Sequence, residues 1–492
     1  TSALWRTKSI EQSIADTDVP SSRLRKDLTA WDLTVFGVAV TIGAGIFVFA
    51  AQEAGDMAGP AVSLSFLLAA IACGFAVLCY AELASTVPVA GSAYTYSYAT
   101  FGELVAWIIG WDLVLEFSMG GAVLAKAWSQ YLADATGGGL STTLRIAGGT
   151  IDWAALLVVG ALTVVLAVGI KLSSRVSQLI TAVKIGVVLL VIVAGAGFIK
   201  LANYTPYIPP AQPGEGGSGL EQSLLSLISG SPGSTYGVFG VLAAASVVFF
   251  AFIGFDVVAT TAEETRNPQR DLPRGIIGSL AIVTVLYVAV ALVITGMQPY
   301  TELSSAATGG EGATLATAFQ NVGLDWIARL ISLGALAGLT TVAMILMLGQ
   351  IRVLFAMSRD GLLPRPLART GVRGVPLRAT VLVGVVVALT AGFAPIDALK
   401  EMVNVGTLFA FVLVSGGVLV LRRTRPDLPR GFRAPLVPLV PVLAIVSCLW
   451  LMLNLTAVTW LRFLVWLVLG MVIYFLYGAR RSRLREAQLV GD

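Results

Sequence analysis

The chain has 492 residues, of which 57% are hydrophobic and only 12% are charged, and its mean hydropathy is +0.86. These values exclude a string of soluble domains and predict a polytopic membrane protein with an all-α fold. The formal charge of +4 gives no reason to expect a nucleic-acid partner, because the basic residues follow the loops between apolar runs.

Apolar stretches of about 20 residues predict twelve transmembrane helices that form one membrane domain in the lipid bilayer. They cover residues 31–54, 60–84, 103–132, 151–170, 176–199, 238–261, 274–298, 325–356, 377–395, 401–421, 435–455 and 459–478. Most Lys and Arg residues lie in the tails or in alternate loops. The excess of positive charge on the inner side therefore predicts that both termini are cytoplasmic.

Three segments lie outside the predicted spans. Residues 1–30 are polar and are expected to form a cytoplasmic tail, as are residues 479–492. Residues 201–237 are rich in Pro, Gly and Ser, which is typical of an external linker or lid.

The side chains used most often in catalysis and metal binding are scarce. The chain has no His, and Cys73, Cys79 and Cys448 lie inside predicted spans. The sequence therefore suggests no disulfide framework, metal cluster or cofactor. An enzyme fits poorly, because no pair of nucleophile and base is visible.

The first predicted span contains the string TIGAGIF at residues 41–47. Gly43 and Gly45 each lower the stability of a helix by about 1 kcal/mol, so we expect two half-helices joined by unwound backbone. Unwound backbone is tolerated at membrane depth only where protein buries it or where it lines a cavity. The sequence therefore predicts a binding site at this break.

Ionisable residues inside the spans are further candidates for function. In the third span, Glu116 lies near the middle and is expected to be functional or paired, whereas Lys126 could extend to the membrane surface. In the fifth span, Lys184 lies roughly 12 Å deep, which is too far for easy contact with the surface. Lys184 is thus expected to be functional or to belong to a buried ion pair, and Glu116 is its hypothetical partner.

The sixth span carries Gly254 among four phenylalanines. A single Gly in a membrane helix usually indicates close packing. However, the first and sixth spans correspond if residues 31–200 and 238–421 form two inverted five-helix repeats, with residues 422–478 outside them. Paired interrupted spans in equivalent halves indicate a transporter site at the bilayer midplane. No repeat is visible at the level of single residues.

Two breaks would supply complementary backbone groups. Free N–H groups around Gly43 to Gly45 suit a carboxylate. Free carbonyls around Thr41 and Ile42, and around Phe250 and Ala251, suit an ammonium group. Together they predict a site for the zwitterionic head of an α-amino acid, with aromatic side chains as walls or a gate. The alternative is that the glycines only let helices approach and that nothing is bound.

Long strings in this chain resemble the amino acid, polyamine and organocation transporter superfamily, and in particular bacterial homologues of cationic amino acid transporters. They are TIGAGIFV, CYAELASTVPVAGSAYTYSYATFGELVAWIIGWDLVLE, FFAFIGFDVVATTAEETRNPQRDLP and SRDGLLP. The resemblance implies two inverted five-helix repeats plus two extra helices, and transport by alternating access.

The resemblance also assigns roles to particular residues. The implied substrate contacts are Thr41, Ile42, Gly43, Ala44, Gly45, Phe250, Ala251 and Ile253. In proton-coupled relatives a lysine at the position of Lys184 takes the place of a coupling sodium ion, so Lys184 is expected to couple transport to protons. The residues themselves, apart from the resemblance, suggest Glu116 as its partner in coupling and Phe252 and Phe255 as a gate. Ala44 replaces a hydroxyl found in many members, and Met344, Leu346 and Met347 argue against a long guanidinium side chain.

We therefore expect a proton-coupled amino acid importer of the cell membrane, for small neutral and, as an open alternative, cationic amino acids. An exchanger of amino acids or polyamines remains the main alternative. A receptor that does not transport, or a channel, is a further alternative. Saturable, stereospecific flux would exclude a simple channel.

Overall fold

The computed structural model describes residues 27–87, 92–137, 139–146, 149–169, 174–213, 219–230, 234–259, 261–305, 307, 312–371 and 374–482. Most of the two predicted cytoplasmic tails lies outside the described residues, as does the centre of the predicted external loop at 214–218. Residues 88–91 of the neutral connection after the second predicted span also lie outside.

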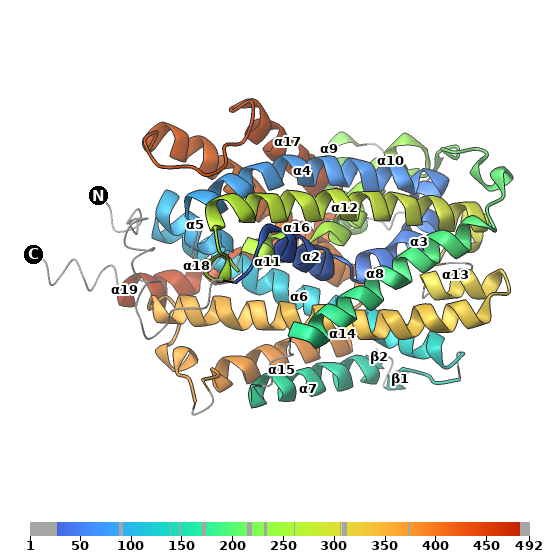
Figure 1. The fold of residues 1–492 in the computed structure, drawn as a ribbon, viewed down its shortest axis with the longest axis horizontal. Coiled ribbons are helices and arrows are strands. Elements are labelled where there is room, and N and C mark those ends of the chain that lie inside the picture. Colours follow the sequence, from blue (N-terminus) through green and yellow to red (C-terminus); the bar gives the residue numbers. More distant parts are fainter. Residues whose placement is uncertain are drawn as a thin grey trace, which may run out of the picture.

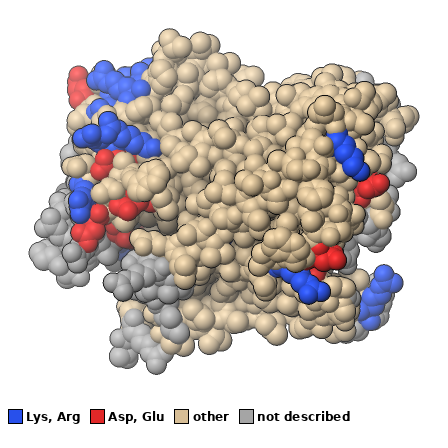
Figure 2. Space-filling view, turned by 45° about the vertical axis from the view of Figure 1, so that its right-hand side comes forward, with Lys and Arg blue, Asp and Glu red and all other residues tan. Residues whose placement is uncertain are grey.

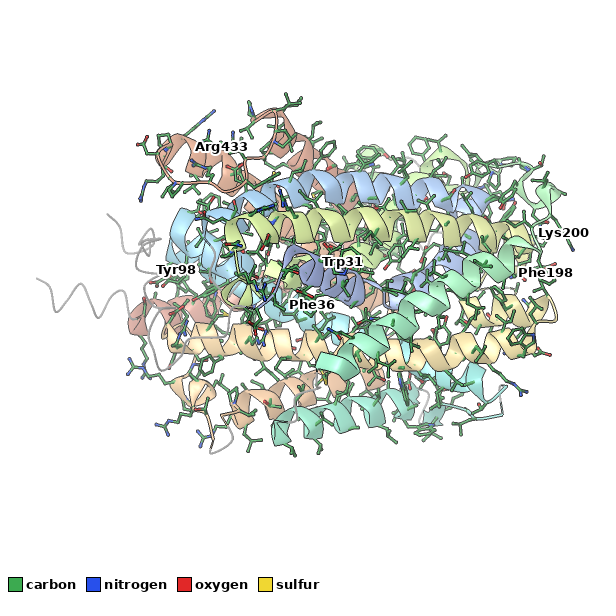
Figure 3. All side chains as sticks on the ribbon, in the orientation of Figure 1. Trp31, Phe36, Tyr98, Phe198, Lys200 and Arg433 are labelled. Atoms are coloured by element: carbon green, nitrogen blue, oxygen red, sulfur yellow. The ribbon has the colours of Figure 1, made fainter. Side chains whose placement is uncertain are left out.

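The chain folds into a bundle of helices, most of which run along the longest axis of the molecule (Figure 1). Helices α5 (Ser92–Thr100) and α19 (Ala479–Arg481) lie at one end of the bundle, which also contains Tyr98 and is called the termini end because α19 is the last described helix (Figures 1 and 3). Lys200 lies at the opposite end, which is called the loop end (Figure 3).

The longest helices form the body of the bundle. They are α4 (Val62–Thr86), α6 (Glu103–Ala135), α8 (Ser174–Ala196), α12 (Pro268–Met297), α14 (Asp325–Arg359) and α16 (Ile396–Thr424). Helix α6 lies inside the bundle and packs on α14 and α16. The shorter helices are α5 (Ser92–Thr100), α7 (Trp153–Val168), α9 (Leu224–Ser229), α13 (Leu315–Asn321), α15 (Leu377–Phe393), α17 (Leu439–Leu453), α18 (Ala457–Ile473) and α19 (Ala479–Arg481).

The structure is that of a polytopic membrane protein. Among the described residues, eight helical stretches are long and apolar enough to cross a bilayer, and four further apolar helices are shorter. Apolar side chains such as Val164, Val193 and Val285 are exposed on the outside of the bundle. On the face drawn in Figure 2, charged side chains lie toward the two ends, with an uncharged band between them. That band matches a surface in contact with lipid hydrocarbon.

Short strands occur only in connections within the described part of the chain. Strand β1 (Thr143–Ile146) pairs antiparallel with β2 (Gly149–Asp152), and β3 (Gln212–Pro213) pairs antiparallel with β4 (Ser234–Thr235). The second pair and α9 lie within the segment predicted as a linker or lid, so that segment has local structure of its own.

The first predicted interruption is present. Helix α2 (Ala30–Thr41) begins with a capping box between Thr29 and Asp32 and ends before Ile42, whose backbone is extended at φ −70° and ψ 96°. The chain resumes as a π-helical segment (Gly45–Phe49) and continues through α3 (Ala50–Glu53). The span that contains TIGAGIF is thus two half-helices, as predicted from its glycines.

The second predicted interruption is also present. Helix α10 (Gly237–Val248) passes into a 3₁₀ turn (Phe249–Phe252), and α11 (Phe255–Ala259) follows after Gly254. Gly254 has φ +130°, a backbone conformation that residues other than glycine rarely adopt. Gly254 therefore turns the backbone at the break, in addition to allowing close helix packing.

We predict that Gly254→Ala destabilises the protein by about 1–3 kcal/mol, because the new Cβ would occupy a backbone conformation disfavoured for alanine. It would also lie 3.0 Å from Val40 Cγ1 and 3.3 Å from Thr41 N. Thermal unfolding of the purified protein in detergent measures the change. Gly186→Ala in α8 is the matched control, since a Cβ there meets open space, and it should leave the midpoint unchanged or slightly higher. Equal midpoints for the two variants would contradict the assignment.

Candidate functional site

The two breaks pack directly against each other. A Cβ added at Gly45 would lie 2.2 Å from Ala251 Cα, so the start of the half-helix that follows the first break touches the 3₁₀ turn of the other break. In return, Gly254 approaches Val40 and Thr41 at the end of α2. Glycine is needed at both positions because each contact involves backbone of the opposite segment.

A small cavity lies where the breaks meet. Its walls come from five segments of the chain, and its volume of about 20 Å³ has room for about one water molecule. The lining residues are Val40, Thr41, Gly43, Ala44, Gly45, Glu116, Phe117, Gly120, Leu124, Phe250, Ile253, Val342, Leu346 and Val403.

Most of the predicted substrate contacts lie in this wall. Thr41, Gly43, Ala44, Gly45, Phe250 and Ile253 all line the cavity. Ile42 and Ala251 are buried but are not among the lining residues, since Ala251 is covered by Gly45. Glu116 adds a carboxyl group to the wall, and it is the only lining residue that can carry a charge.

Side chains from other helices satisfy the carbonyls that the breaks release. Tyr287 of α12 donates its hydroxyl to the Thr41 carbonyl at 2.7 Å, and Tyr131 of α6 donates to the Phe47 carbonyl at 2.6 Å. Asn404 of α16 donates to the carbonyls of Ser246 and Val247 at 2.8 and 3.2 Å. The prediction of a free carbonyl at Thr41 is therefore wrong for this conformation. The one signal in the sequence that could have indicated these donors is their polarity within apolar spans.

Lys184 reaches the end of α2 from α8. Its side chain is buried, and its Nζ donates a hydrogen bond to the Ala39 carbonyl. The stem of Lys184 crosses Gly338 of α14, where an added Cβ would lie 2.5 Å from Lys184 Cδ. This placement agrees with a lysine that does not extend to the membrane surface.

The structure does not join Lys184 to Glu116. Among the ion pairs of the described residues none links these two side chains, and Lys184 is not in the cavity wall whereas Glu116 is. Lys184 thus contacts the site through the backbone of α2. Lys126 lies elsewhere, 3.9 Å from Asp152 near the loop end of α6.

The phenylalanines predicted to form a gate lie behind the cavity wall. Phe252 packs edge-on against Tyr287, with ring centroids 5.4 Å apart, and Phe255 packs against Phe411 at 5.1 Å. Neither lines the cavity, whereas Phe250 does. Residue order alone cannot separate these positions, because the 3₁₀ turn rotates each phenylalanine toward a different neighbour.

An ion pair that the sequence did not predict lies beside Phe49, which packs against Phe250. Phe250 packs edge-on against Phe49 at 5.3 Å, and Lys400 Nζ lies 5.0 Å from the centre of the Phe49 ring. Lys400 also bonds Glu53 at 2.8 Å and Asp397 at 2.7 Å. Glu53 and Lys400 are both buried, so this pair links α3, which follows the first break, to α16.

The described residues contain no group of three His, Cys, Asp or Glu side chains placed to hold a metal ion. The cavity wall consists of backbone at two breaks, the polar side chains of Thr41 and Glu116, and apolar side chains. Such a site can bind and orient a small zwitterion.

Comparison with known protein families gives a match to the amino acid permease model over residues 28–479. Three similar proteins illustrate the range of relatives. The branched-chain amino acid permease of Bacillus subtilis is 43% identical, with 98% of this chain and 99% of the relative aligned. The methylthioribose transporter of the same organism is 40% identical over 99% of this chain and 100% of the relative. The vacuolar cationic amino acid transporter 4 of Arabidopsis thaliana is 31% identical, with 95% of this chain and 94% of the relative aligned.

We predict that Tyr287→Phe lowers the stability of the protein by about 1–3 kcal/mol, because the Thr41 carbonyl loses its donor in a buried place. Thermal unfolding in detergent is the measurement. Tyr477→Phe is a suitable control, since the described contact of that ring is a cation–π contact with Arg481 that the substitution retains. If both variants unfold at the wild-type midpoint, water or a rearranged backbone replaces the hydroxyl.

Proposed function

Because the chain belongs to the amino acid permease family of the amino acid, polyamine and organocation superfamily, we propose that it imports α-amino acids by alternating access as a proton-coupled symporter. The family and the relatives make it a multi-pass membrane transporter and not an enzyme. The direction of transport, the coupling ion and the cell membrane as its location are parts of the proposal.

The observation that carries the proposal is the meeting of two broken helices around one cavity. A helical segment restarts at Gly45, and Gly43, Ala44 and Gly45 line the cavity; the N–H groups at such a start suit the carboxylate of an amino acid. Glu116 also lies in the wall, and its carboxyl group suits the ammonium group, whereas the predicted free carbonyl of Phe250 accepts a hydrogen bond from the Ile253 N–H at 3.2 Å. A helix start and a carboxyl group on the wall of one cavity match the two charges of an α-amino acid head.

The remaining wall favours a small or branched apolar side chain. Gly120 and Leu124 of α6 face Val342 and Leu346 of α14, and Val403 of α16 completes this side. None of these apolar residues would recognise a basic side chain. The Glu116 carboxylate could balance the charge of a cationic substrate. The names of the relatives cover branched-chain and cationic amino acids, in line with this range.

Transport also requires that the cavity change size. At about 20 Å³ it is too small for an amino acid, so binding requires that its walls separate. The contacts of Lys400, Glu53, Phe49 and Phe250 close it toward the loop end, where α3 lies (Figure 1). Phe255 and Phe411 lie toward the termini end, beside α11. We propose that these two groups of contacts open in alternation.

The proposed architecture is the one expected from the sequence, with twelve spans and both termini in the cytoplasm. Residues 31–200 and 238–421 form the inverted repeats, and the spans in 422–478 lie outside them. The support is that α2 and α10 are each interrupted and that the interruptions meet. The termini end is then the cytoplasmic end.

Uptake of labelled alanine, leucine and arginine into sodium-free liposomes tests the proposal. With an acid-outside pH gradient, we expect accumulation of alanine or leucine above equilibrium, with arginine transported less well, because the cavity wall is largely apolar. Liposomes without a gradient are the control. Flux only when amino acid is preloaded inside would instead identify an exchanger, and no saturable flux would reject transport of these substrates.

We propose Lys184 as the proton-coupling residue, since its ammonium group holds the end of α2 beside the cavity. Lys184→Met keeps an unbranched stem against Gly338 but removes the titratable group. We expect its uptake to lose the dependence on the pH gradient, while counterflow of preloaded substrate persists. Lys126→Met is the matched control and should keep the wild-type dependence. If Lys184→Met accumulates substrate as the wild type does, the coupling role is wrong.

A further inference from the structure

Asp112 is a buried carboxyl group that the proposed mechanism does not use. It lies in the first third of α6, and its side chain has no exposed surface. Both carboxyl oxygens are buried, and neither has a hydrogen-bond partner among the described residues. Buried polar groups in proteins are nearly always hydrogen-bonded, so a carboxyl group without a partner requires an explanation.

The position of Asp112 relates it to the cavity. It precedes Glu116 by four residues, so the two side chains share one face of α6 and are about 6 Å apart along the helix axis. Glu116 lines the cavity, as does Val403 of α16. Asp112 lies beside Gly406 of α16, where an added Cβ would be 2.9 Å from Asp112 Oδ1. Asp112 therefore lies one helical turn from the cavity, in the same interface between α6 and α16.

The direction along α6 places Asp112 on the side of the termini end. Helix α6 starts at Glu103, which accepts a hydrogen bond from Tyr98, and Tyr98 lies at the termini end (Figure 3). Asp112 falls between Glu103 and Glu116. A path from the cavity toward the termini end along α6 would thus pass Asp112.

No charged neighbour neutralises this carboxyl group within the described part of the chain. Helices α5, α7, α13, α14, α15, α16 and α18 pack on α6. Their described titratable or charged residues, with those of α6 itself, are not joined to Asp112 by an ion pair or hydrogen bond. These residues are Tyr94, Tyr96, Tyr98, Glu103, Glu116, Lys126, Tyr131, Asp134, Asp325, Arg329, Arg352, Arg359, Arg378, Asp397, Lys400, Glu401, Arg422, Arg423 and Arg462.

Several of these groups have partners of their own. Lys400 is held by Glu53 and Asp397, Arg422 is held by Glu82, and Glu401 accepts from Thr456. An ionised carboxylate with neither water nor a partner is strongly disfavoured relative to the neutral acid. The closed conformation therefore favours a proton on Asp112, and hydration of the cavity would favour its release.

We propose that Asp112 is a proton-binding site of the transport cycle, additional to Lys184. In the closed conformation its carboxyl group carries the proton. When the cavity opens toward the termini end, water reaches Asp112, the O–H bond breaks, and the proton passes to that water as the carboxylate forms. This inference rests on the proposed proton coupling, and it assigns a second titrating group to the same site.

Infrared difference spectroscopy of the full-length protein in liposomes tests the site directly. Spectra recorded with and without saturating leucine, in H₂O and D₂O, detect the C=O stretch of a protonated carboxyl group. We expect a deuterium-sensitive acid band that changes when substrate is added. Asp112→Asn should remove that band. Asp134→Asn is the matched control on the same helix, since Asp134 accepts a hydrogen bond from Thr314 at 2.7 Å and should contribute no such band.

Two further variants keep the test decisive if Asp112→Asn folds poorly. Glu116→Gln separates a band of Glu116 from that of Asp112. Gly406→Ala retains both carboxyl groups but places a methyl group against Asp112 Oδ1, so it should shift the frequency of the Asp112 band. Asp112→Asn should also lower the number of protons taken up per substrate, whereas Asp134→Asn should not.

The outcomes separate the site from the proposed function. An acid band of Asp112 that never changes with substrate or pH would mean a permanently protonated structural group and would overturn the inference. Absence of any band assigned to Asp112 would do the same. If wild-type uptake ignores the pH gradient while the Asp112 band responds to substrate, then proton-coupled symport is wrong and the proton site stands.

Discussion

Unwound backbone inside a membrane must find hydrogen-bond partners within the protein, and this requirement organises the structure. Two helices stop and restart at the same depth, and each stop releases carbonyl groups that lipid cannot satisfy. Lys184, Tyr287 and Tyr131 supply donors to the first break, and Asn404 supplies one to the second. These four side chains come from four helices. The need to satisfy two short segments therefore fixes the relative positions of α6, α8, α12 and α16 around them.

Small residues let those helices approach closely enough to do so. Gly45 touches Ala251, and Gly338 leaves room for the stem of Lys184. Polar side chains and glycines thus cooperate, because a donor can reach a carbonyl only where no Cβ lies in between. The result is a closed centre in which a single carboxyl group, that of Glu116, faces a cavity the size of a water molecule. Such a centre can accept a substrate only together with a movement of its walls.

The sequence predicted the parts of this arrangement that depend on local chemistry. The breaks followed from Gly43, Gly45 and Gly254, and the burial of Lys184 followed from its depth in a span. Contacts between segments distant in the sequence could not be predicted from it. The apolar run of α12 does not indicate that Tyr287 would donate a hydrogen bond to the Thr41 carbonyl. The position of Lys400 near the start of α16 does not indicate that Glu53 would be its partner. Phe250, Phe252 and Phe255 look alike in sequence, and only the 3₁₀ turn decides which one faces the cavity.

The halves of the first broken span are held by different neighbours. The end of α2 is bonded to Lys184 of α8 and Tyr287 of α12, whereas the segment beyond the break is bonded to Tyr131 of α6. Ile42 and Gly43 connect them. The Ile42 backbone is extended and its N–H bonds to the Val38 carbonyl of α2, whereas the Gly43 carbonyl accepts from the Phe47 N–H of the second half. The two halves can therefore pivot about these residues independently, each following its own helices as a rigid lever.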